Sequence, residues 1–342
     1  MSEASKVKEK LKWPWFVGGA IHGVFLRFMF DVLPSSVEGP MSVAFLIGTP
    51  FIVGALTIYG YRGQRLRISQ MIFFPWITTL LMLLGTAIAL LEGSICIAIM
   101  TPLFLALSSF GGLFMGGCLH LIKSNTKPLL SIAVLPYFIF FSEANMPLQN
   151  RQLTITESVV INAMPEKVWN EIMTAKEIQA DELPLSISHL IGVPKPIEGI
   201  NRASDGVEIR YSLWERGVNF KAIVEESVEY KYIKWKYVFD TDSFPKGSMD
   251  DHVAIGGRYF DLQDTSFTLS SVEEDKTTLT IHAHYRINSA VNFYAIPISK
   301  FLGVDFVRTI LGLYKNRSEA VKAEKSNISL RLSDVKFSAC LT

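Results

Sequence analysis

Charge of either sign is sparse between Trp13 and Phe141 of this 342-residue sequence. The charged residues between Trp13 and Phe141 are Arg27, Asp31, Glu38, Arg62, Arg65, Arg67, Glu92, Lys123 and Lys127. Such sparse charge indicates a membrane-embedded region, because long apolar runs match the hydrocarbon core of a bilayer. After Gln149 charged and apolar residues alternate closely, which is typical of a water-soluble domain with half-buried strands. We therefore expect two unlike parts that meet near Glu143.

Cysteines are few, and the sequence has almost no excess of positive charge. The three cysteines are Cys96, Cys118 and Cys340, and their placement predicts no disulfide framework. A net charge of +1 gives no reason to expect nucleic acid as a partner. No motif in the sequence predicts a cofactor.

Five apolar segments approach the length of about 20 residues that a membrane-spanning helix needs. They cover residues 13–33, 42–61, 70–91, 94–122 and 128–141, within a transmembrane region at 13–142 that follows a basic tail at 1–12. The last segment is the shortest, and a re-entrant or interfacial segment is the alternative there. Inside the first segment, Arg27 is expected to pair with Asp31 at i+4 rather than to serve transport. In the fourth, small residues such as Gly112 and Gly116 predict close packing within the bundle.

The charges of the connecting loops predict an orientation, since cytoplasmic loops are enriched in lysine and arginine. Basic residues occur before the first segment, after the second and after the fourth, whereas the other two loops contain only acidic charges. This alternation places the N-terminus in the cytoplasm and, with five spans, the C-terminal domain outside. In a bacterial inner membrane that domain would be periplasmic. If segment 128–141 does not cross, the domain is cytoplasmic.

The C-terminal part predicts an α+β domain. Residues 153–161 alternate as a strand, and helical patterns follow Pro165 and cover Ile178 to Ile191. Several alternating runs then predict an antiparallel meander with one solvent-exposed face. In one run Val207, Ile209, Tyr211 and Leu213 share a face. A long helix is expected around residues 292–323, before a tail at 324–342.

One motif in this part resembles the first residues of a known domain superfamily. The segment Val160-Ile-Asn-Ala-Met-Pro-Glu-Lys-Val-Trp169 is similar to the opening of the SRPBCC superfamily, which includes START lipid-transfer domains and polyketide cyclase/dehydrase-like proteins. The resemblance covers residues 150–323 and implies a helix-grip fold, a curved antiparallel sheet closed over a long C-terminal helix. It also implies a site for a lipid or other apolar small molecule beside the bilayer. It implies no single chemistry, because members include transfer proteins, receptors and enzymes.

The candidate site residues come from the alternating strands and the loops. The inward-facing aromatic residues expected to line a ligand cavity are Trp235, Tyr237, Phe239, Tyr285 and Phe306, although they could equally form a solid core. Glu215 and Arg216 are candidates for the cavity mouth, with a simple turn as the alternative. Asp251 and His252 are the candidate acid–base pair, with exposed loop polarity as the alternative.

A metal site is not predicted. His282 and His284 lie on the same face of one expected strand, a spacing that suits two metal ligands, but no third ligand is identifiable. Three hypotheses follow for the whole chain. The first is a membrane-tethered domain that binds an apolar molecule, the second is a tethered enzyme of cyclase or hydrolase type, and the third is a non-catalytic assembly or signalling protein.

Overall fold

The computed structural model describes residues 12–32, 41–121, 148–204, 206–250, 254–273 and 275–338, apart from the side chains of residues 31, 204 and 321–338. The chain forms two compact units, Met1–Leu148 with Ser289–Val291, and Gln149–Asn288 with Asn292–Thr342. The composition break near Glu143 lies outside the described residues, and the second unit begins at Gln149.

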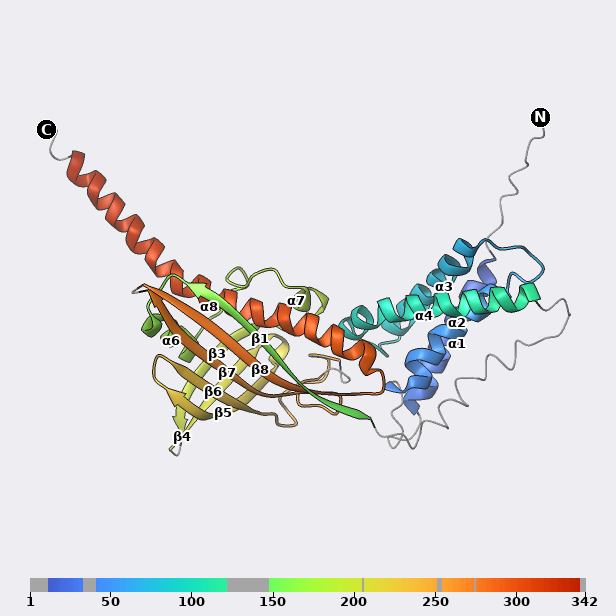
Figure 1. Ribbon diagram of the computed structural model, residues 1–342, viewed down its shortest axis with the longest axis horizontal. Coiled ribbons are helices and arrows are strands. Elements are labelled where there is room, and N and C mark those ends of the chain that lie inside the picture. The colour runs from blue at the N-terminus through green and yellow to red at the C-terminus, as the bar shows by residue number, and fades with distance from the viewer. Residues whose placement is uncertain are drawn as a thin grey trace. The chain divides into compact units, whose positions relative to one another are not determined.

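The N-terminal unit is helical (Figure 1). Its elements are α1 (Trp13–Val32), η2 (Ala44–Gly48), α2 (Thr49–Tyr59), α3 (Ile68–Ile88) and α4 (Ser94–Leu121). These elements match the first four apolar segments of the sequence within a few residues. The fifth segment, 128–141, lies outside the described residues. By length and composition, α3 and α4 are long and apolar enough to cross a membrane, and Ala44–Tyr59 is a shorter apolar helix. The described residues thus hold two candidate spans where the sequence predicted about five.

Glycines on α4 let neighbouring helices approach closely, as the sequence predicted. A Cβ placed on Gly111 would lie 1.8 Å from the main-chain oxygen of Phe51, and one on Gly112 would lie 2.2 Å from that of Met71. Both distances are too short for real atoms, so only glycine fits at these two crossings. By contrast, a Cβ on Gly117 would meet nothing within 4 Å. The helices α2, α3 and α4 therefore pack backbone against backbone at defined glycines.

The C-terminal unit contains a curved sheet and one long helix (Figure 1). The strands are β1 (Gln149–Ile161), β2 (Thr174–Ala175), β3 (Pro196–Ser204), β4 (Val207–Trp214), β5 (Asn219–Val228), β6 (Tyr232–Val238), β7 (Phe260–Glu273) and β8 (Lys276–Ser289). The helices are α6 (Pro165–Met173), α7 (Ile187–Ile191) and α8 (Asn292–Ser338). A single 3-10 turn, η3 (Glu215–Gly217), follows β4. The helix predicted over Ile178 to Ile191 is confined to α7. The last helix extends past the predicted end at 323, because neither glycine nor proline follows Gly312 to stop it.

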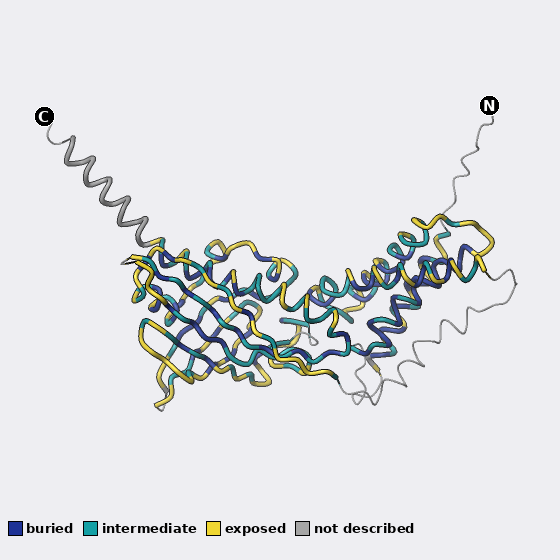
Figure 2. The backbone as a smooth tube through the Cα atoms, viewed as in Figure 1, coloured by how far each residue is buried: buried dark blue, intermediate teal, exposed yellow. Residues whose placement is uncertain are grey.

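All eight strands belong to one antiparallel sheet with the order β1-β8-β7-β6-β5-β4-β3-β2. The helix α8 covers one face of this sheet, and its buried residues Val307, Leu311 and Tyr314 share a core with strand residues such as Trp235 and Ile281. Along β8 buried and partly exposed residues alternate strictly (Figure 2). This arrangement is the predicted helix-grip fold.

The segment from Val160 to Trp169 has the strand end and the helix start that its sequence predicts. Met164 has an extended backbone, and α6 begins at Pro165, whose fixed φ suits the first turn of a helix. Val168, Trp169 and Ile172 then lie on one buried face of α6 and join the core. The apolar stripe predicted for this helix is confirmed.

Along strand β4 from Val207 to Leu213, the apolar residues lie on the outer face of the sheet, and the polar residues lie on the inner face. Val207, Tyr211 and Leu213, the apolar face noted in the sequence, are 44%, 37% and 42% exposed. Arg210 and Ser212, in contrast, are buried. The pairing explains this, because directly opposed residues share a face of the sheet and Arg210 lies opposite the fully buried Ala222 of β5. The grip interior therefore contains polar side chains on β4 where the other central strands place apolar ones.

Candidate ligand-binding site

Aromatic rings from four elements gather at one end of the grip interior. Trp214 of β4 stacks on Phe306 of α8, with ring centroids 5.4 Å apart and an interplanar angle of 22°. Phe220 of β5 contacts Trp214 at 5.4 Å and Tyr237 at 5.8 Å. Tyr237 in turn stacks on Phe239 at 6.0 Å. We call these five residues, Trp214, Phe220, Tyr237, Phe239 and Phe306, the aromatic cluster.

The aromatic cluster is not a sealed core. Phe220 is only 6% exposed, whereas the other four members are partly exposed. Because these rings join α8 to β4, β5 and β6, the cluster lies where the helix closes over the sheet. A partly open set of flat apolar surfaces is suited to contact an apolar ligand.

The sequence predicted three of the five cluster members, namely Tyr237, Phe239 and Phe306. It missed Trp214 and Phe220, although the inward phase of β4 and β5 could have indicated both. The other two predicted cavity residues lie elsewhere. Trp235 packs edge to face on Phe267 at 4.8 Å, and Tyr285 contacts Phe260 at 5.7 Å.

The two tyrosine hydroxyls in the interior are desolvated and hydrogen-bonded to neighbouring hydroxyls. Tyr237 Oη donates to Thr265 Oγ1 over 3.1 Å, and burial raises the pKa of Tyr237. Tyr285 Oη lies 3.4 Å from Ser299 Oγ on α8, and burial raises its pKa also. Both phenols therefore stay neutral at physiological pH and act as hydrogen-bonding groups.

A buried arginine that the sequence did not single out lies deeper in the interior. Arg210 Nη1 donates to the main-chain oxygen of Ile172 over 2.7 Å and to Asn201 Oδ1 over 3.0 Å. Its Nη2 donates to Tyr314 Oη over 3.2 Å. The guanidinium carbon also lies 4.6 Å from the ring centroid of Trp235. No periodic apolar pattern reveals such a residue, because sequence alternation on β4 pointed to the opposite face.

A histidine borders the aromatic cluster from the loop side. His189 of α7 contacts Phe306 with a centroid separation of 5.8 Å. Its Nδ1 lies 3.0 Å from the main-chain oxygen of Val193, which can only accept, so Nδ1 carries the proton in the neutral ring. Its Nε2 is buried and has no hydrogen-bond partner among the described residues. Burial lowers the pKa of His189, so the ring is neutral at physiological pH with a free lone pair on Nε2.

The loop that carries α7 is attached to α8 through Asp305. Asp305 Oδ2 accepts from Ser186 Oγ over 2.6 Å and from the main-chain nitrogen of Ser188 over 2.8 Å. Burial opposes ionisation of this carboxyl, but the hydrogen bonds prevail and lower its pKa. His189 is thereby fixed beside Phe306.

The predicted mouth residues form a turn. Glu215 Oε2 accepts from the main-chain nitrogen of Lys195 over 3.0 Å, which joins η3 to the loop before β3. Arg216 is exposed, adopts a left-handed backbone with φ of 59°, and donates to the main-chain oxygen of Ser248 over 3.0 Å. Both residues thus hold loops together at the end of β4. The candidate acid–base pair Asp251 and His252 lies outside the described residues.

The two histidines on β8 are engaged with neighbouring side chains. His284 Nδ1 lies 2.6 Å from Asp264 Oδ1, and His282 Nδ1 lies 2.9 Å from Thr156 Oγ1. Within the described ranges no group of three or more histidine, cysteine, aspartate or glutamate residues is placed to hold a metal ion.

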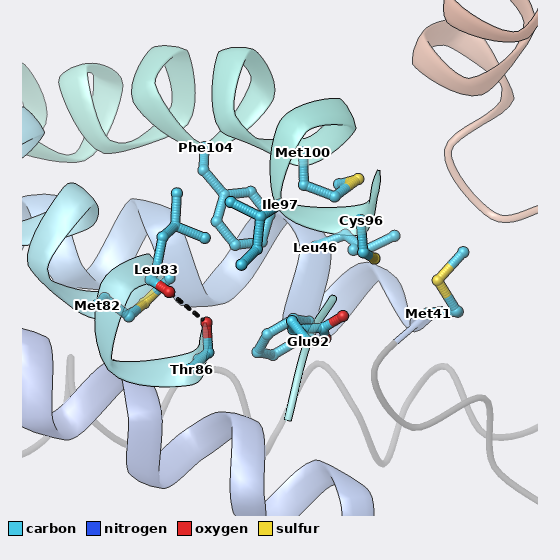
Figure 3. Close-up of a pocket in the computed structure, with 11 residues that line it drawn as sticks. Met41, Leu46, Met82, Leu83, Thr86, Glu92, Cys96, Ile97, Met100 and Phe104 are labelled. Atoms are coloured by element: carbon cyan, nitrogen blue, oxygen red, sulfur yellow. Dashed lines mark hydrogen bonds between the residues drawn. The ribbon is translucent and has the colours of Figure 1, made fainter. Parts of the chain in front are cut away.

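The described part of the N-terminal unit contains a buried ion pair. Arg27 Nε lies 2.5 Å from Glu92 Oε1, and its Nη2 donates to the main-chain oxygen of Leu91 over 2.8 Å. The sequence predicted Asp31 as the partner of Arg27, whereas the ion pair that the structure describes joins α1 to the loop between α3 and α4. Glu92 also borders a pocket whose other labelled lining is mostly apolar and rich in methionine, including Met82 and Met100 (Figure 3).

Comparison with known proteins gives similarity in fold only. No family model matches the chain, and no curated protein matches it. Among solved structures, it is similar to a START superfamily protein from Mycobacterium smegmatis at 15% identity and a TM-score of 0.34, over 49% of this chain and 98% of that one. It is also similar to norcoclaurine synthase from Thalictrum flavum, in complex with dopamine and hydroxybenzaldehyde, at 11% identity and a TM-score of 0.30, over 51% and 88% of the two chains. The Zhui aromatase/cyclase from a Streptomyces species matches at 10% identity and a TM-score of 0.30, over 49% and 96%. The fold assignment itself rests on the strand order and on α8.

Proposed function

We propose that the C-terminal domain binds an apolar small molecule or lipid between α8 and the sheet. The observation that carries this proposal is the aromatic cluster, in which partly exposed rings from α8, β4 and β6 surround the buried Phe220. Rings that were needed only for the core would be fully buried, as Trp235 is at 1% exposure. Exposed apolar surface is energetically unfavourable in water, and a ligand that covers it removes that cost.

We further propose that the N-terminal unit anchors this domain at a bilayer. The two candidate spans α3 and α4 and the loop charges support an inner-membrane protein with a cytoplasmic N-terminus. About five spans, including 128–141, would place the domain in the periplasm. A ligand that is poorly soluble in water concentrates in the membrane, so a domain held there avoids a long aqueous transfer.

Native mass spectrometry of the full-length chain, released from mild detergent, tests the binding proposal. A co-purified apolar molecule is expected, and its loss in Trp214→Ala would locate it at the aromatic cluster. A chain that shows no adduct, and that also fails to enhance the fluorescence of the neutral apolar probe N-phenyl-1-naphthylamine, would contradict the proposal and favour an assembly or signalling role.

A reporter fused to the C-terminus tests the topology separately. An alkaline phosphatase fusion is expected to be active, because that enzyme folds only in an oxidising compartment. An active cytoplasmic reporter in the same position would refute the five-span arrangement. The result does not depend on ligand binding.

A second candidate function is catalysis of the cyclase or hydrolase type, and His189 is the observation that favours it. Its neutral ring presents an unpartnered Nε2 beside Phe306, which is the state that a general base requires. If the domain is an enzyme, His189→Gln should abolish turnover in a substrate screen while leaving binding of the neutral probe intact. A change in probe binding alone would assign His189 to the binding surface instead.

A further inference from the structure

Arg210 is a buried cation whose partners in the described structure are all uncharged. It is 8% exposed, and its three hydrogen bonds go to a main-chain oxygen, an amide oxygen and a phenol oxygen. The face of Trp235 adds a fourth, weaker attraction. A charge removed from water is stable only when other groups replace its hydration, and a neutral set replaces it incompletely.

Glu208 is linked to Arg210 through the side chain of Asn201 and does not contact the guanidinium directly. Glu208 Oε1 accepts from Asn201 Nδ2 over 3.1 Å, and Asn201 Oδ1 accepts from Arg210. Because an ionised carboxylate only accepts, Glu208 fixes the orientation of the Asn201 amide so that its oxygen meets the guanidinium. Glu208 therefore positions Arg210 without being its direct partner.

Donors remain unused around this guanidinium. An arginine has five N–H groups, and Arg210 spends two from Nη1 and one from Nη2 on the bonds above. The Nε–H and one Nη2–H take part in none of the hydrogen bonds described for Arg210. Trp235 is 1% exposed, and the guanidinium lies over its ring. Its buried Nε1–H has no acceptor among the described residues.

The backbone is shaped to hold the guanidinium in this position. A Cβ on Gly199 of β3 would lie 2.4 Å from Arg210 Nη2 and 3.0 Å from Cζ. The absence of a side chain at this position is what allows the guanidinium to lie against β3. The position of Arg210 is therefore fixed by β3, by α6 through Ile172, and by α8 through Tyr314.

We propose that the ligand of this domain carries a carboxylate on an apolar body, and that Arg210 binds this carboxylate with Trp235 Nε1 as an additional donor. This inference rests on the proposed function and adds the chemical class of the ligand to it. The apolar body contacts the aromatic cluster, because Tyr237 joins the two regions. It stacks on Phe239, and it lies in one row with Arg210 across the sheet, since Ala222 of β5 is opposite both Arg210 and Tyr237. A planar carboxylate matches the paired N–H geometry of a guanidinium better than a neutral hydroxyl does.

The test compares two ligands that differ only in the head group. The full-length chain in phosphatidylcholine nanodiscs is loaded with N-phenyl-1-naphthylamine, and dodecanoate or dodecanol is added at neutral pH to displace it. Empty nanodiscs correct for partition of each molecule into lipid. We expect dodecanoate to displace the probe at a concentration at least about tenfold lower than dodecanol does, which corresponds to one charge-assisted contact.

Variants assign the difference to Arg210. In Arg210→Met the advantage of dodecanoate should disappear while displacement by dodecanol is unchanged. Arg202→Met is the matched control, because Arg202 is an exposed arginine of β3 with its guanidinium over the ring of Tyr211. That control should keep the full preference for dodecanoate.

Each outcome distinguishes the inference from the function on which it rests. If the unmodified chain binds the probe and both competitors displace it equally, the carboxylate inference is wrong and the proposed function stands. If the chain does not bind the probe, the proposed function fails and the inference fails with it. The comparison on the unmodified chain remains decisive even if Arg210→Met does not fold.

Discussion

The guanidinium of Arg210 lies over the indole ring of Trp235 at 4.6 Å from its centroid. One residue comes from β4 and the other from β6, and the strand between them, β5, has the small residue Ala222 directly opposite Arg210. This relationship defines the polar part of an otherwise apolar interior. It also separates the interior into a deep polar region and the partly open aromatic cluster.

Truncation of the aromatic cluster should weaken binding of an apolar probe. Trp214→Ala and Phe306→Ala each remove one ring of the stacked pair, so we expect the Kd for N-phenyl-1-naphthylamine to rise by about tenfold. The measurement is a fluorescence titration of the full-length chain. Phe301→Ala is the control, because Phe301 is on the same helix and 52% exposed. Equal Kd values for Phe301→Ala and Phe306→Ala would argue against the cluster as the binding surface.

The loop that carries α7 should loosen from α8 when Asp305 loses its charge. In Asp305→Asn the one carbonyl oxygen can still accept from Ser186 Oγ and Ser188 N, but the amide NH2 group then faces the main-chain nitrogen of Ile187, which donates to Oδ1 over 3.3 Å, and the remaining hydrogen bonds lose their charge assistance. Hydrogen exchange of residues 186–193 is expected to accelerate. Asp181→Asn, which changes an exposed acid in the same loop, should leave the exchange rates unchanged. Unaltered exchange in Asp305→Asn would show that packing alone holds the loop.

The same carboxyl predicts a pH dependence. Because the pKa of Asp305 is lower in the folded chain than in the unfolded one, its stabilising effect is complete above the unfolded value. That effect is lost as the pH falls through the folded pKa. After correction for the slower intrinsic exchange of amides in acid, the protection of residues 186–193 in the unmodified chain should therefore fall as the pH is lowered, and Asp305→Asn should lack this particular loss of protection.

His189 should resist protonation. Burial lowers its pKa below the ordinary value near 6.5, so the unfolded state binds the proton more readily and acid destabilises the fold around this residue. An NMR titration of the His189 ring should show a midpoint below the ordinary histidine value near 6.5. A midpoint at or above that value would contradict the neutral ring on which the general-base proposal depends.

Two glycines of the same helix should respond differently to alanine. Gly111→Ala places a Cβ against the main-chain oxygen of Phe51, and overpacking of this kind costs about 1–3 kcal/mol or more. Gly117→Ala meets nothing within 4 Å and should be neutral or stabilising by up to about 1 kcal/mol, because alanine favours the helix. Thermal unfolding of the detergent-solubilised chain measures both. Similar melting temperatures for the two variants would show that the α2–α4 contact is not close.

Local patterns in the sequence were sufficient for most of the elements. Apolar runs located α1 to α4, and the motif from Val160 to Trp169 predicted both the strand end and the buried face of α6. Strand alternation, followed by one helical segment, predicted the helix-grip fold. These features depend on residues close in sequence, so periodicity and local backbone preferences reveal them.

Tertiary structure decided which face of each strand is inward and which distant residues meet. The apolar set Val207, Tyr211 and Leu213 is outward, because register with β5 places Arg210 in the interior. Each of the two buried arginines also has a partner far along the chain: Glu92 is 65 positions from Arg27, and Tyr314 is 104 positions from Arg210. An apolar helical region and a grip-like domain could be predicted from the sequence alone, since both follow from local periodicity. Only the folded chain determined a buried guanidinium with neutral partners, because sheet register and helix closure are set by packing across the whole domain.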